Sequence, residues 1–91
     1  MNLWIVAYDI KETKVRSRVS SILKDYGQRV QYSVFECWLT SRQLRDLRVR
    51  IKEEIEPDDQ VRWYSLCSWC ASRITWQGIG KLTEDTKYSM I

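Results

Sequence analysis

The sequence contains no histidine among its 91 residues. This absence removes the usual general base near neutral pH, the Ser-His and Cys-His nucleophile pairs, and the zinc sites that need imidazole. The groups that remain for catalysis are carboxylates, lysines, tyrosines, cysteines and a bound metal. Together with a carboxylate at a strand end, Asp9, this absence leads us to expect that any hydrolysis by the chain requires a divalent metal.

Long apolar runs are also missing. No stretch approaches the length of a membrane span, and the first residues lack the charged and apolar regions of a signal peptide. We expect a cytoplasmic protein with no membrane partner. With no internal repeat, low-complexity tract or linker, residues 1–91 are expected to form a single domain. A domain of this size buries a small fraction of its surface, which favours an obligate partner.

Cysteine is scarce, and two of the three thiols stand close together. Cys67 and Cys70 have the C-x-x-C spacing of redox and zinc sites, and Cys37 is the third. A structural zinc site normally needs four ligands, which one chain without histidine does not supply. We expect reduced, partly buried cysteines, with an intermolecular site or a redox pair as the alternative.

The basic residues are mostly arginine. The net charge is only +3, but nine of the fifteen basic residues are arginines, whose planar fork suits bidentate contact with phosphate. Nucleic acid is the natural acidic partner. The alternative is that these arginines simply lie on solvated outer faces of helices.

An aspartate ends the first apolar segment of the chain. Residues 3–8 are apolar and strand-like, and Asp9 follows where a buried strand would leave its sheet. Apolar residues then recur at helical spacing up to Gly27, with Thr13 as the expected N-cap. A strand end of this kind is a common place for chemistry.

The rest of the chain alternates between strand and helix patterns. Residues 29–39 alternate as a strand, and a capping box of Thr40 and Gln43 begins a second helix that Pro57 stops. Further strands are expected at 60–67 and 72–76, and the tail, 86–91, is a candidate short fifth strand.

Two helices separated by strand pairs predict an α+β, ferredoxin-like β-α-β-β-α-β fold, in which an antiparallel sheet has helices on one face. The opposite face is then uncovered and would carry bulky side chains such as Trp4, Phe35 or Tyr64, depending on register. Because a large exposed apolar surface normally marks an association site, a homodimer packed sheet to sheet is expected.

Four segments in this order carry a resemblance to a known family. They are Tyr8-Asp9-Ile10, Arg16-Ser17-Arg18-Val19, residues 27–36 (Gly-Gln-Arg-Val-Gln-Tyr-Ser-Val-Phe-Glu) and residues 59–67 (Asp-Gln-Val-Arg-Trp-Tyr-Ser-Leu-Cys). In these segments the chain resembles the small CRISPR-associated endoribonuclease family of the spacer-acquisition machinery. The last fifteen residues add little to the likeness.

The resemblance implies a symmetric homodimer in which Asp9 faces its symmetry mate and holds a divalent metal, Mg²⁺ or another such as Mn²⁺. It implies metal-dependent cleavage of single-stranded RNA or double-stranded DNA, and bridging of two dimers of the CRISPR integrase during spacer integration. By matching positions, Arg16, Arg18, Arg29 and Phe35 would be further functional residues. The tail of one subunit would add a strand to the other's sheet.

Alternatives stay open at each of these positions. Asp9 could be a turn carboxylate, the three arginines could pair with Glu12, Asp25 or Glu36, and Phe35 is more often core or interface than a base-stacking platform. On the second helix a further flank could follow a phosphate backbone: Arg42, Arg45, Arg48 and Lys52.

Three functions therefore compete. The first is a metal-dependent nuclease acting at Asp9, and the second is a non-catalytic DNA-binding scaffold that bridges integrase dimers. A toxin-like messenger RNA nuclease of similar size is the third.

Overall fold

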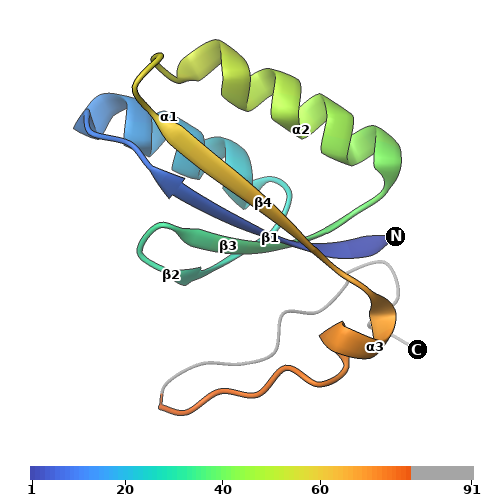
Figure 1. The fold of residues 1–91 in the computed structure, drawn as a ribbon. Helices are drawn as coiled ribbons and strands as arrows, with labels where there is room; N and C mark the ends of the chain where they lie inside the picture. The colour runs from blue at the N-terminus through green and yellow to red at the C-terminus, as the bar shows by residue number, and fades with distance from the viewer. Residues whose placement is uncertain (79–91) are drawn as a thin grey trace.

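The structure, a computed structural model, describes residues 1–78 and has two helices packed on one face of an antiparallel sheet (Figure 1). The elements follow the order β1 (Asn2–Asp9), α1 (Thr13–Lys24), β2 (Gln28–Gln31), β3 (Val34–Leu39), α2 (Ser41–Glu54), β4 (Gln60–Leu66) and α3 (Ser68–Ala71). The strands lie in the order β2-β3-β1-β4. The predicted ferredoxin-like β-α-β-β-α-β fold is confirmed. No helix within residues 1–78 is long and apolar enough to cross a membrane.

The two long helices begin in different ways. At α2 the expected capping box is present: the Gln43 N–H donates to Thr40 Oγ1 at 3.1 Å, and the Thr40 N–H donates to Gln43 Oε1 at 2.9 Å. At α1 the expected cap is wrong, because Glu12 occupies the N-cap position without a side-chain bond and Thr13 is the first helical residue. The Thr13 hydroxyl instead accepts a hydrogen bond from Arg16.

The core lies between the helices and one face of the sheet. Val6 of β1 and Phe35 of β3 are opposite each other in the register and are fully buried. They pack with apolar residues of α1 and α2: Val15, Val19, Leu23, Leu47 and Ile51. Burying each such side chain stabilises the fold by about 1.5–3 kcal/mol. Strand alternation places Leu3, Ile5, Ala7 and Asp9 on the other face.

The single strand predicted over 29–39 is wrong, because the segment is a hairpin. Tyr32 and Ser33 form the turn between β2 and β3, and the register shifts between Arg29 and Gln31. Phe35 therefore faces the helices rather than the uncovered face, while Tyr64 lies on the uncovered face and is 47% exposed. A one-residue difference in register moves a side chain to the other face, so alternation alone did not decide this point.

The strand predicted over 72–76 is also absent. The chain turns into α3 directly after β4, and residues 72–78 run beneath the sheet on the face opposite α1 and α2 (Figure 1). α3 packs against β1 and β4, burying Ala71 and leaving Leu3 only 1% exposed. The second face of the sheet is thus covered at this end. The tail, 86–91, lies outside the described residues.

Candidate functional site at the end of β1

Asp9 is exposed at the end of β1, opposite Gln60 of β4. Within residues 1–78 its side chain makes no hydrogen bond or ion pair. The same residues contain no group of three or more histidine, cysteine or acidic side chains that could hold a metal. One chain therefore offers a single available carboxylate, which Mg²⁺ can use when water, phosphate or a second carboxylate completes its coordination.

Arg16 holds the loop that follows Asp9. Its Nη1 donates to the carbonyl oxygens of Ile10 at 2.8 Å and Lys11 at 3.3 Å, and its Nη2 donates to Thr13 Oγ1 at 3.1 Å. The guanidinium carbon lies 6.0 Å from the centre of the Tyr32 ring. Arg16 thus connects the β1–α1 loop to the β2–β3 turn.

Arg29 and Phe35 form a second connected pair. Arg29 Nη2 donates to Ser20 Oγ of α1, and its guanidinium carbon lies 5.6 Å from the centre of the Phe35 ring. Phe35 is fully buried and stacks with Tyr8, with ring centroids 6.4 Å apart. A buried ring cannot stack on a nucleic-acid base, so in this arrangement Phe35 supports Arg29 from the core.

The β2–β3 turn is fastened to the end of β1. The Tyr8 N–H donates to the Ser33 carbonyl at 3.0 Å, and the Tyr8 hydroxyl donates to the Tyr32 carbonyl at 3.5 Å. Tyr32 itself is 71% exposed. The turn, α1, β2 and the end of β1 line an open pocket of about 370 Å³.

We call this open pocket the basic pocket. Three of its lining residues are cationic and the other six carry hydroxyl groups: Arg16, Lys24, Arg29, Tyr8, Thr13, Ser17, Ser20, Ser21 and Tyr32. None is acidic. Cations and hydroxyl donors without a competing carboxylate suit phosphate oxygens.

The structure thus brings Arg16 and Arg29 together but does not bring Asp9 into the same pocket. Asp9 neighbours Tyr8 in sequence, yet strand alternation directs it to the opposite face of the sheet. The Asp9 carboxylate and the basic pocket therefore lie at the same end of the sheet but on opposite faces of it.

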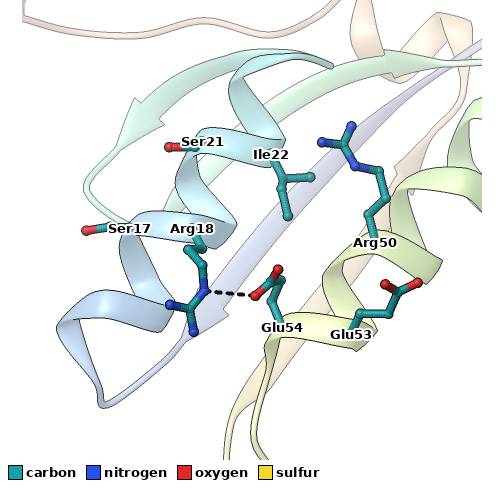
Figure 2. Close-up of a pocket in the computed structure, with 7 residues that line it drawn as sticks. All are labelled: Ser17, Arg18, Ser21, Ile22, Arg50, Glu53 and Glu54. Atoms are coloured by element: carbon teal, nitrogen blue, oxygen red, sulfur yellow. Dashed lines mark hydrogen bonds and ion pairs between the residues drawn. The ribbon is translucent and has the colours of Figure 1, made fainter.

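Arg18 lies outside the basic pocket. Its Nε donates to Glu54 Oε2 at 2.8 Å, which joins α1 to α2 across a separate cavity of about 380 Å³ (Figure 2). Its partner is none of the carboxylates considered from sequence. Both side chains are partly exposed, so the pair contributes little stability.

The basic flank of α2 borders β4, whereas the basic pocket borders β2 at the opposite edge of the sheet. Arg42, Arg45, Arg48 and Lys52 are all exposed. Arg48 lies over the Trp63 ring at 5.5 Å, and Arg48 and Lys52 line a groove between α2 and β4. The flank and the basic pocket therefore face different directions.

Sequence reasoning missed Lys24, Ser20 and Tyr32. A signal was available, because Arg16, Ser20 and Lys24 recur every four residues and so occupy one side of α1. The position of Tyr32 depends on the hairpin turn, which the alternation of 29–39 concealed.

Comparison with known proteins gives a consistent result. The family described as CRISPR associated protein Cas2 matches residues 1–74. CRISPR-associated endoribonuclease Cas2 3 of Chloroflexus aurantiacus is 40% identical over 88 residues, covering 96% of this chain and 95% of that protein.

Two solved structures have the same fold. The crystal structure of Streptococcus pyogenes Cas2 is 36% identical, with a TM-score of 0.69 over 84% of this chain and 99% of that one. A chain of a partial Cas6-RT-Cas1–Cas2 complex is 29% identical, with a TM-score of 0.64 over 82% of this chain and 83% of that one.

Proposed function

This chain belongs to the Cas2 family of CRISPR-associated proteins, and on that premise we propose that it acts in CRISPR adaptation as a homodimer with a metal-dependent endonuclease site. The observation that carries the proposal is the basic pocket, which offers three cations and no carboxylate at the same end of the sheet as Asp9. Its substrate is double-stranded DNA or single-stranded RNA, and its partner is the CRISPR integrase; the matched complex names Cas1 together with Cas2.

Asp9 is the proposed metal ligand. A twofold axis that brings two Asp9 carboxylates together would supply two anionic ligands for Mg²⁺ or Mn²⁺, and water and phosphate would complete the shell. When bound, such a metal lowers the pKa of its water and offsets phosphate charge. The protein's own residues act by position: Arg16 fixes the loop after Asp9, and Arg29 lines the basic pocket at the same end of the sheet.

A second candidate is a non-catalytic scaffold that binds duplex and bridges integrase dimers. It is favoured by the solitary position of Asp9, since residues 1–78 contain no metal-ligand cluster. Family membership favours both candidates over a toxin-like messenger RNA nuclease. Both use the basic pocket, so binding by this pocket tests what they share.

If the basic pocket binds phosphate, its cations should contribute to the salt dependence of the affinity for duplex DNA. Lys24→Gln and Arg29→Gln should each reduce the slope of log affinity for duplex DNA against log salt by about 0.9. A protein that makes one phosphate contact fewer releases fewer counterions when it binds. Fluorescence anisotropy with two duplexes of unrelated sequence measures the slope. Both duplexes should respond alike, because phosphate contacts do not read bases.

The matched control is Lys14→Gln, which removes one exposed positive charge from α1 outside the pocket. This variant should leave the slope unchanged. Equal slopes for Lys14→Gln and Lys24→Gln would contradict a phosphate site in the basic pocket.

The proposed homodimer rests on the second sheet face, where Tyr64 and Arg62 are exposed beside half-buried Ile5 and Ala7. Tyr64→Glu should shift the protein from dimer to monomer at low micromolar concentration, because it buries a carboxylate against the partner. Sedimentation velocity measures the shift. Val49→Glu, at a 53% exposed position on α2, is the control and should stay dimeric. A wild-type protein that sediments as a folded monomer would rule the dimer out.

A further inference from the structure

We propose that Cys67 and Cys70 form a reversible redox dithiol that exchanges with small disulfides of the glutathione type, with Cys67 attacking and Cys70 resolving. The expectation of partly buried cysteines is wrong for this pair, because both thiols are free and exposed. Only Cys37 is buried. The dithiol lies in the segment after β4, away from Asp9 and the basic pocket, so the proposal is independent of the proposed function.

The backbone places the Cα atoms of the two cysteines at a separation that a disulfide can span. Cys67 is the N-cap of α3, and Cys70 follows one turn later. The separation of their Cα atoms depends on the conformation of Ser68 and Trp69, which are both helical. Helical geometry sets that separation at about 5 Å. Disulfides join Cα atoms about 4.4–6.8 Å apart, so the bond can close without rebuilding the turn.

Hydrogen bonds make the two sulfurs unequal. The Cys70 N–H donates to Cys67 Sγ at 3.4 Å. The pKa of Cys67 is lowered, first by this backbone hydrogen bond and then by the Cys70 thiol, while the pKa of Cys70 is raised because its thiol bonds to Cys67. Cys67 thus loses its proton more readily than Cys70, and the thiolate is the nucleophile in disulfide exchange.

The surroundings suit a small anionic disulfide. Residues 67–78 contain one arginine and no acidic residue. Trp69, which lies between the two cysteines in the sequence, has an exposed ring. The arginine, Arg73, lies over this ring, with its guanidinium carbon 4.6 Å from the ring centre. Cys37 provides a contrast, because burial and then the charge of Glu36 raise the pKa of its thiol to about 12. It should stay reduced.

The exchange balances without a further reactant. The Cys67 thiolate attacks one sulfur of oxidised glutathione, the disulfide bond breaks, and one glutathione leaves as a thiolate that takes up a proton. The Cys70 thiol then loses its proton and attacks Cys67 Sγ, which displaces the second glutathione. The protein dithiol is oxidised to a disulfide, and one glutathione disulfide is reduced to two thiols. The new bond would cross-link the turn that holds Ala71 against β1 and β4.

The test uses the full chain equilibrated in buffers of increasing oxidised-to-reduced glutathione, quenched by alkylation and read by peptide mass spectrometry. We expect a disulfide between Cys67 and Cys70 within one chain, reversal by reduced glutathione, and Cys37 alkylated only after denaturation. Alkylation of Cys67 should also reach its plateau at lower pH than that of Cys70. A pair that stays reduced in every buffer, or that forms only disulfides between chains, would overturn the proposal.

Single variants test the two roles. Cys70→Ser should accumulate one glutathione on Cys67, because the resolving thiol is gone. Cys67→Ser should take up glutathione several-fold more slowly. Equal uptake by the two variants would show that the sulfurs are equivalent and would overturn the assignment of attacking and resolving thiols.

Discussion

Asp9→Asn is expected to abolish metal-dependent cleavage of nucleic acid while leaving the fold and duplex binding unchanged. Asparagine has nearly the same shape as aspartate but lacks the negative charge that holds a divalent metal. Because Asp9 is exposed and makes no interaction within residues 1–78, nothing in the described fold depends on its charge. We expect the rate to fall by at least about a hundredfold, which corresponds to about 2.7 kcal/mol in the barrier.

The measurement compares cleavage of single-stranded RNA and duplex DNA by purified wild type and variant, with Mg²⁺, with Mn²⁺ and with chelator. Asp58→Asn is the matched control, since it removes an exposed carboxylate from the loop before β4. It should cleave as wild type does. Cleavage that survives in both Asp9→Asn and chelator would contradict a metal site at Asp9.

The same experiment separates the nuclease from the scaffold. A pure wild-type protein that binds duplex through the basic pocket but cleaves neither substrate with either metal would be a scaffold. In that case Asp9→Asn should still be examined by sedimentation, because a carboxylate at the twofold axis would influence assembly instead of chemistry.

Gly27→Ala is expected to destabilise the protein by about 3 kcal/mol, since overpacking a tight site usually costs about 1–3 kcal/mol and occasionally more. A Cβ atom at this position would lie 2.9 Å from the Cα of Cys37 and would also strike the Glu36 carbonyl oxygen. Both obstacles are backbone atoms of β3. They can move only if β2 separates from β3, since Gln28 pairs with Glu36.

Urea unfolding followed by circular dichroism at one fixed protein concentration measures the loss, because dimerisation would make stability depend on concentration. The control is Lys14→Ala at an exposed position of α1, where surface substitutions usually change stability by less than about 0.5 kcal/mol. A Gly27→Ala midpoint equal to that of the control would show that β3 can yield.

The pattern of the sequence predicted the elements whose signals are local. Helical spacing of Val15, Val19 and Leu23 identified α1, and the Thr40–Gln43 capping box identified the start of α2. Both signals come from residues three or four positions apart, so no distant contact is needed to produce them. The place of Asp9 at the end of β1 was also predictable from a local signal, because Asp9 directly follows a contiguous apolar run.

Only the tertiary structure decided which segments pair as strands and what each long side chain contacts. The turn at Tyr32 divides one alternating segment into β2 and β3, and register then places Phe35 in the core. Period-two alternation is the same in one strand and in two, so the sequence could not distinguish them.

The contacts of the arginines at the candidate site could not be predicted from the sequence either. Arg16 and Arg18 are two residues apart on α1, yet one holds the loop after Asp9 while the other pairs with Glu54 of α2. Residues i and i+2 point to different sides of a helix, and what each long side chain reaches depends on which element packs there. The sequence by itself determined α1, α2, the strand that ends at Asp9 and the excess of arginine. Packing of the hairpin and α2 against α1 determined which arginines form the basic pocket.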